Sequence, residues 1–226
     1  MSMESKIIVM LTHHDQTVGH ALAVFETCKD LPVEFWGFKD VGIPTEQMKT
    51  LHAAMKAAGK KTFLEVVTYT PESCLAGAKL AVEFGFDYLM GTLFYPEVWD
   101  YLKDKDIRYF PFVGDVTGSP SVLKGSTESM LAQADAFVRQ GVSGVDLLAY
   151  RFADGDPEVL AKTFVEGSNL QVVIAGSIDS QDRIGIVNEI NPWAFTMGSA
   201  LFDEKFKQGA SFRENLQRVV EIMGAQ

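Results

Sequence analysis

Two Gly-Ser pairs stand at the ends of short apolar runs in the last quarter of the chain. They are Gly176 and Ser177, after the run at residues 172–175, and Gly198 and Ser199, after the run at residues 194–197. Glycine lets the backbone turn sharply and approach a ligand, and a serine that opens a helix leaves backbone N–H groups available. Two such turns side by side present several N–H donors to one anion, so the pattern predicts a phosphate site.

Charged residues interrupt three other apolar runs, and they are Lys39, Glu65 and Asp146. An unpaired buried charge is costly, so each must point into a polar cavity or be paired. Side chains alternate along a strand, and placing Leu64 and Val66 against helices turns Glu65 to the opposite face. The same alternation turns Lys39 towards Glu65 on the neighbouring strand. This arrangement predicts an acid–base pair or an imine-forming lysine, and a structural ion pair is the alternative.

Other polar residues near the predicted strand ends are weaker candidates. Arg151 has forked donors that suit an anion, and we expect it to assist phosphate binding. Asp146 is a catalytic candidate that lies lower in its run, so Tyr150 or Arg151 is nearer the end. Asp115 and Asp179 follow the fifth and seventh runs and are further candidates.

The histidines do not form a pattern typical of a metal site. His13 is a candidate for substrate contact, together with its neighbours His14 and Asp15. Adjacent residues on a strand point to opposite faces, so at most one of the two histidines would face a site. The other two histidines, His20 and His52, fall within predicted helices, whereas a metal usually needs three or more converging ligands. No metal is expected.

Eight apolar runs alternate with helical patterns, which predicts a parallel sheet with a helix after each strand. The runs span residues 7–11, 33–38, 62–67, 88–92, 108–113, 145–150, 172–175 and 194–197. Eight such units in 226 residues predict a (β/α)8 barrel, with residues 1–226 forming a single domain. An open doubly wound sheet is the alternative, but the glycine-rich turn typical of it is missing after the first run.

Three local predictions follow from the connecting segments. The segment 114–125 is rich in Gly, Ser and Thr and unusually long for a strand–helix connection, which predicts a mobile lid. A small extra helix is expected at 202–206, and the first helix is expected at 18–28. Ser211 and Glu214 have the spacing of a capping box, which predicts the start of the last helix.

Composition limits the kinds of partner. The net charge is −10 and the basic residues are scattered, which argues against nucleic acid binding. No apolar run is long enough to cross a membrane or to act as a signal peptide. Two cysteines, Cys28 and Cys74, do not make a disulfide framework, so we expect two buried thiols in a reducing cytoplasm.

The two Gly-Ser turns resemble those of the phosphate-binding TIM-barrel superfamily. Its ribulose-phosphate-binding members include isomerases of histidine and tryptophan biosynthesis and pentulose-phosphate epimerases. In those families a glycine-rich turn after strand seven and a Gly-Ser or Gly-Thr turn after strand eight hold the phosphate. Gly176, Gly198 and Ser199 match this pattern directly, and Ser177 stands where a second glycine is usual. The resemblance covers about the last quarter of the chain, and it implies a barrel that binds a phosphate.

Together these features predict an enzyme that acts on a small phosphorylated carbonyl or sugar-phosphate compound. The reaction would be of the isomerase, epimerase, aldolase or decarboxylase type. A non-catalytic metabolite sensor, resembling the glycerol-phosphate-responsive antiterminator barrels, is the alternative. No cofactor is expected, although FMN is compatible with the same turns through its phosphate. The sequence sets no oligomeric state, and a homodimer is the assembly considered.

Overall fold

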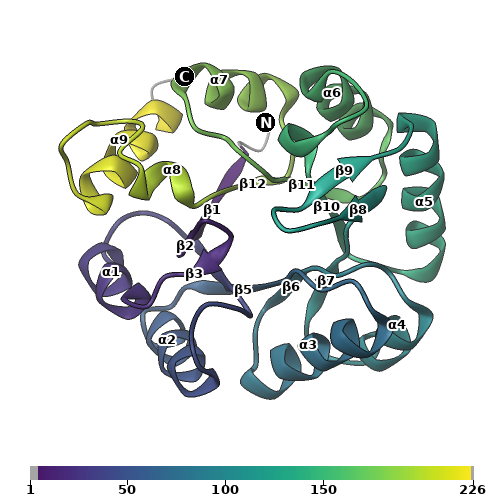
Figure 1. The fold of residues 1–226 in the computed structure, drawn as a ribbon, viewed down its shortest axis with the longest axis horizontal. Coiled ribbons are helices and arrows are strands. Elements are labelled where there is room, and N and C mark those ends of the chain that lie inside the picture. The colour runs from purple at the N-terminus through teal and green to yellow at the C-terminus, as the bar shows by residue number, and fades with distance from the viewer. Residues whose placement is uncertain (1–4, 225–226) are drawn as a thin grey trace.

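The computed structural model describes residues 5–224, which form a barrel of parallel strands surrounded by helices (Figure 1). The barrel strands are β1 (Lys6–Met10), β4 (Phe35–Lys39), β5 (Lys61–Val66), β6 (Tyr88–Gly91), β7 (Arg108–Phe110), β10 (Gly144–Leu147), β11 (Gln171–Ile174) and β12 (Ala194–Met197). Their order in the sheet is β10-β11-β12-β1-β4-β5-β6-β7, and every neighbouring pair is parallel. The predicted (β/α)8 architecture is confirmed.

The barrel closes between β7 and β10 through a short seam. Phe112 forms a parallel bridge with Asp146, and the Asp146 N–H donates to the carbonyl of Pro111 at 2.9 Å. In a strand, the N–H and C=O of one residue point to the same side, so the missing N–H of Pro111 faces this seam. Proline cannot donate to a ladder, which explains why a bridge rather than a full ladder closes the sheet.

The helices form the outer layer of the barrel (Figure 1). They are α1 (Ala21–Cys28), α2 (Thr45–Ala57), α3 (Pro71–Phe84), α4 (Pro96–Leu102), α5 (Thr127–Gln140), α6 (Pro157–Gly167), α7 (Gln181–Ile190), α8 (Ser199–Phe202) and α9 (Phe212–Gly224), with a 3₁₀ turn, η1 (Ala149–Arg151). The predicted capping box before α9 is present, because Ser211 N–H donates to Glu214 and the Glu214 N–H donates to Ser211 Oγ. Both cysteines are unpaired and buried, as predicted. Within residues 5–224, no helix combines the length and apolarity needed to cross a membrane.

A short hairpin follows β1, in the segment between the first apolar run and the helix predicted at 18–28. It consists of β2 (Thr12–His13) and β3 (Gln16–Thr17), which pair antiparallel. His14 and Asp15 form its turn with φ of 49° and 61°, the left-handed backbone that two-residue hairpin turns require. The first helix begins at Ala21 rather than at residue 18, and the Val18 N–H donates to the Leu11 carbonyl at 3.1 Å, across the base of the hairpin.

A second hairpin occupies the segment 114–125, which is predicted to be a mobile lid. The strands β8 (Asp115–Thr117) and β9 (Val122–Lys124) pair antiparallel. The Tyr69 hydroxyl lies at the hairpin tip, 2.6 Å from Ser121 Oγ, and it donates to the Gly118 carbonyl at 3.0 Å. The segment is thus ordered by backbone pairing, while its movement stays a prediction.

The predicted helix at 202–206 is wrong in position. The short helix α8 begins directly after β12, at Ser199, and ends at Phe202. The turn at Gly198 leads straight into the helix, so no loop separates the strand from it. This placement puts the first backbone N–H groups of α8 at the carboxyl end of β12.

Aromatic and aliphatic side chains fill the barrel interior below the carboxyl ends of the strands. This inner cluster consists of Ile8, Met10, Phe35, Phe63, Tyr88, Met90, Phe110, Val173 and Ala194, with Trp193 packed against it. The Phe63 and Tyr88 rings stack with centroids 4.1 Å apart. Because this layer is apolar, only the upper end of the barrel is left for charged groups.

Replacing Gly144 with alanine tests the packing of this interior. A Cβ at Gly144 would lie 2.2 Å from Phe110 Cε1 and 2.5 Å from the Gln171 carbonyl oxygen. Overpacking of this kind typically lowers the free energy of unfolding by about 1–3 kcal/mol, which urea denaturation would measure. Gly19→Ala is the matched control, since a Cβ there meets nothing within 4 Å. Equal effects of the two substitutions would contradict this packing.

Candidate active site

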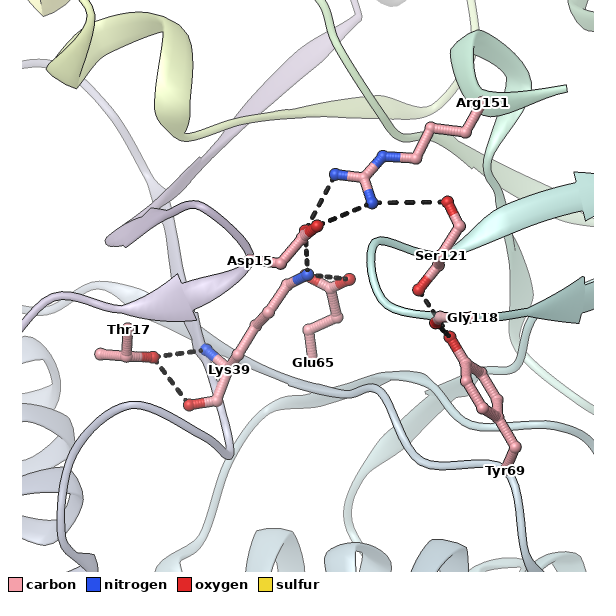
Figure 2. A network of polar contacts seen from close by, with 8 residues as sticks. All are labelled: Asp15, Thr17, Lys39, Glu65, Tyr69, Gly118, Ser121 and Arg151. Carbon is pink, nitrogen blue, oxygen red and sulfur yellow. Dashed lines mark hydrogen bonds and ion pairs between the residues drawn. The ribbon is translucent and has the colours of Figure 1, made fainter.

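Lys39 and Glu65 form an ion pair at the carboxyl ends of β4 and β5 (Figure 2). The strand register places the two residues directly opposite each other, and Lys39 Nζ lies 3.4 Å from Glu65 Oε1. Their side chains are only 7% and 9% exposed. Strand alternation therefore predicts the location of this pair correctly.

Asp15 is brought to this pair by the turn of the β2–β3 hairpin. Lys39 Nζ donates to Asp15 Oδ1 at 2.8 Å. Arg151 donates to both carboxylate oxygens of Asp15, at 2.9 and 3.1 Å, so Asp15 joins the two cations (Figure 2). Thr17 secures the base of the hairpin, because its hydroxyl donates to the Lys39 carbonyl and accepts from the Lys39 N–H.

The central position of Asp15 is the main feature that the sequence interpretation misses. Sequence reasoning treats Asp15 only as a neighbour of the two histidines. The signal that could have revealed it is the polar segment 12–17 between two apolar stretches, which is compatible with a tight hairpin. Each of its strands has only two residues, so no alternation is visible.

The carboxylates keep Lys39 protonated. Burial alone would lower the pKa of Lys39, but the negative charges of Glu65 and Asp15 outweigh it and raise the pKa above 10.5. Burial raises the pKa of Asp15, but hydrogen bonds from Arg151 and Lys39 outweigh burial and hold that pKa at about 2. The resting site therefore favours a charged ammonium over the neutral amine that an imine requires.

Asp146 lies deeper in the barrel than the Lys39–Glu65 pair. Its side chain is fully buried, and within residues 5–224 neither carboxyl oxygen has a hydrogen-bond partner. Burial raises the pKa of Asp146 well above 3.8, the Glu65 carboxylate raises it further, and Lys39 and Arg151 oppose this. These causes favour the protonated, neutral form of Asp146. Of Tyr150 and Arg151, which the sequence places nearer the end of this run, Arg151 is the one that reaches the mouth of the barrel.

The two predicted phosphate turns lie beside this network. Gly176 has φ of 91°, and a Cβ there would lie 3.0 Å from Arg151 Cγ. A Cβ on Gly198 would lie 2.7 Å from Thr12 Oγ1 and 2.9 Å from the Thr12 carbonyl oxygen. Both turns thus need glycine because other parts of the site approach their backbones closely.

One cavity of about 200 Å³ joins the charged network to the turns. Its lining includes Lys39, Glu65, Arg151, Ser177, Ser199 and Lys205. Drug-sized ligands typically occupy cavities of roughly 300–1,000 Å³, so this volume suits a smaller compound. Lys205 is a cation of the lining that the sequence interpretation does not single out.

The histidines lie at the rim rather than at the centre of the network. His13 Nε2 lies 2.9 Å from Oδ1 of Asp203, a residue of the cavity lining, and the ring centroids of His13 and His14 are 3.8 Å apart. His14 lines a neighbouring opening with Asp15. Within residues 5–224, no group of three or more His, Cys, Asp or Glu side chains is placed to hold a metal ion.

The remaining acidic candidates take different places. Asp179 lines the cavity, and its Oδ1 lies 2.9 Å from Arg183 Nη1. Asp115 instead lies in β8, on the hairpin that covers the mouth. The structure therefore brings together Lys39, Glu65 and Arg151 with both phosphate turns, places Asp146 below them, and places His13 and Asp115 outside them.

Comparisons with known proteins reveal the fold of the chain. No protein-family model and no curated protein matches it. The orotidine 5'-phosphate decarboxylase of Pyrococcus horikoshii OT3 has a TM-score of 0.70 at 10% identity, over 96% of this chain and 99% of that one. The tryptophan synthase A-subunit of Pyrococcus furiosus has a TM-score of 0.67 at 12% identity, over 100% of both chains. A glycerol uptake operon antiterminator-related protein of Thermotoga maritima has a TM-score of 0.54 at 16% identity, over 88% and 98% of the two chains.

At these identities the similarity shows the fold alone. The chain is a TIM barrel, as the resemblance of its Gly-Ser turns implies.

Substituting Asp146 tests its protonation through the pH dependence of stability. The folded chain holds the Asp146 proton more tightly than the unfolded chain, where the pKa is near 3.8. Wild-type stability therefore falls as pH rises from about 4 through the raised pKa, by about 1.4 kcal/mol for each unit of pKa shift. The Asp146→Asn variant lacks this titration, so its free energy of unfolding should change less over the same range.

Urea denaturation at a series of pH values would measure this difference. Asp104→Asn, at an exposed position, serves as the control for loss of an ordinary carboxylate. Identical pH slopes for wild type and Asp146→Asn would show that burial does not keep Asp146 neutral.

Proposed function

We propose that the protein is an enzyme that acts on a small phosphorylated carbonyl or sugar-phosphate compound. The observation that supports this most directly is the shared cavity, in which Lys39 faces the same space as the turns at Ser177 and Ser199. A substrate whose phosphate lies at the turns would extend its other end towards the Lys39 network. The reaction is of the isomerase, epimerase, aldolase or decarboxylase type.

The phosphate would bind at the carboxyl ends of β11 and β12. The first N–H groups of α8 have no acceptor within the helix, and they follow Gly198 directly. The turn at Gly176 and Ser177 lines the same cavity. Lys205 and Arg151 are cations of the same lining that would bind the phosphate, although Asp179 and Asp203 also line it.

Lys39 would stabilise the negative charge that develops during the reaction. Proton removal or carbon–carbon cleavage next to a carbonyl group, which all four reaction types can use, passes through an enolate. A buried ammonium fixed in place stabilises such charge more than water does, because it needs no reorganisation. Glu65 and Asp15 keep Lys39 charged and oriented, so its role is that of an electrophile rather than an imine-forming amine.

The Lys39→Met variant tests this chemistry on an identified substrate. We expect turnover to fall by about 10²–10³-fold, the loss typical of removing one charge-stabilising donor. Substrate binding should be largely kept, because the phosphate turns remain. A panel of phosphorylated aldehydes, ketones and keto acids, assayed by product analysis, would identify the substrate. Full turnover in Lys39→Met would rule out this role.

The Gly198→Val variant tests the phosphate site. A side chain at residue 198 collides with Thr12, so binding of phosphate monoesters should weaken by at least about tenfold. Titration followed by NMR would report binding at the amides of residues 176–178 and 198–200. Gly19→Val serves as the control, since a Cβ at Gly19 meets nothing within 4 Å. Undiminished binding in Gly198→Val would place the phosphate elsewhere.

A metabolite sensor is the second candidate function. One feature of the resting site favours a sensor. Asp15 is already paired with Lys39 and Arg151, so it is not available as a base, and a sensor needs no base. The chain also shares its fold with the antiterminator-related protein of Thermotoga maritima. Tight binding of a phosphate monoester without turnover of any compound in the panel would favour the sensor.

A further inference from the structure

Asp15 is a carboxylate without a base function in the resting site. A general base works best with a pKa near the operating pH, whereas hydrogen bonds from Arg151 and Lys39 hold that of Asp15 at about 2. Asp15 nevertheless lines the cavity, next to the ammonium that would stabilise an enolate. Loss of one of its two cations would make it a stronger base.

Arg151 is the cation that can leave, because it lies between Asp15 and a phosphate turn. Its stem packs over Gly176, where a Cβ would lie 3.0 Å from its Cγ. Its guanidinium reaches Asp15 (Figure 2). The Arg151 side chain is 24% exposed, against 7% for Lys39. Arg151 borders both the main cavity and the opening that His14 and Asp15 share. Arg151 therefore lies within reach of both the Asp15 carboxylate and the turn at Gly176.

We propose that Arg151 leaves Asp15 for the phosphate of the bound substrate, and that Asp15 then acts as the general base. This inference rests on the phosphate site of the proposed function. A phosphate monoester carries more negative charge than a carboxylate, and its oxygens accept the two parallel bonds of a guanidinium. Substrate binding thereby activates the base, and an empty site keeps it inactive.

The proton transfer balances without a further reactant. The C–H bond next to the substrate carbonyl breaks, and its proton forms an O–H bond on the Asp15 carboxylate. The electron pair of the broken C–H bond forms a carbon–carbon double bond, and the carbonyl oxygen takes the negative charge. The Lys39 ammonium stabilises this oxygen. In a substrate with a hydroxyl group on the deprotonated carbon, that hydroxyl passes its proton to the enolate oxygen, and Asp15 returns its proton to the former carbonyl carbon. The carbonyl group has then moved by one carbon, which completes an isomerisation.

The charged and titratable groups around Asp15 come from several elements. Lys39 on β4 and Arg151 on η1 bind it directly, and Glu65 on β5 acts on it through Lys39. His14 adjoins it in the hairpin turn. Departure of Arg151 removes the largest pKa-lowering contact, while Lys39 still orients the carboxylate.

A double-mutant cycle with inorganic phosphate tests the exchange of partners. In wild type Asp15 competes with phosphate for Arg151, so Asp15→Asn should tighten phosphate binding by about tenfold. In the Arg151→Met background the same substitution should have little effect. Calorimetric titration at neutral pH measures all four affinities, and circular dichroism verifies that each variant is folded. Arg151→Lys repeats the cycle with a milder change.

Removal of any negative charge from the cavity strengthens the binding of an anion, so Asp15→Asn needs a control that removes the same charge elsewhere in the lining. Asp203→Asn supplies it, since Asp203 lines the same cavity and contacts His13 rather than Arg151. We expect Asp203→Asn to tighten phosphate binding much less than Asp15→Asn does. On an identified substrate, Asp15→Asn should also lower kcat by at least about a hundredfold, opposite to its effect on phosphate binding.

The outcomes separate this inference from the proposed function. In one outcome, Gly198→Val weakens phosphate binding, but Asp15→Asn and Asp203→Asn change it equally. That result overturns the exchange of partners and leaves the phosphate site intact. An Asp15→Asn gain that persists in Arg151→Met also overturns it. Absence of phosphate binding, or binding insensitive to Gly198→Val, removes the phosphate site and with it both proposals.

Discussion

Burial of the Lys39 ammonium is the constraint on which the mouth of this barrel depends. An ammonium taken out of water is costly unless carboxylates pair with it, and two are present. Glu65 comes from the neighbouring strand and is supplied by strand register alone. Asp15 comes from a hairpin turn with a left-handed backbone, held to β4 through Thr17. The left-handed backbone of that turn places the Asp15 carboxylate next to the buried ammonium of Lys39.

The same constraint explains the state of the deeper carboxyl group. Lys39 is paired with Asp15 and Glu65, and Arg151 is paired with Asp15, so both cations are already held by other carboxylates. Burial and the Glu65 carboxylate raise the pKa of Asp146, which has no hydrogen-bond partner within residues 5–224, and this favours its protonated form. A substrate phosphate adds negative charge at the outer side of the cavity. There Arg151, the Lys205 side chain and the backbone N–H groups of α8 would meet it, and the Lys39–Glu65 pair would stay in place.

Much of this architecture is predictable from the sequence, because strands and helices have regular periods. Eight apolar runs predict the barrel, and alternation within one run turns Glu65 inwards towards Lys39. The hairpins are not predictable in the same way, since strands of two or three residues are too short to show alternation. Asp15 depends on such a hairpin, and its contact with Arg151 joins residues 136 positions apart. Only the folded chain reveals that contact.

The charge of Lys39 is the central claim, and its direct measurement is a pH titration of the Lys39 amine. Selective ¹⁵N labelling of lysine, with Lys39→Met to assign the signal, would follow its Nζ by NMR. The account predicts that Lys39 stays an ammonium to a pH above the ordinary 10.5, and that Glu65→Gln lowers its pKa. An amine that loses its proton near neutral pH would contradict the account and would restore the imine-forming lysine.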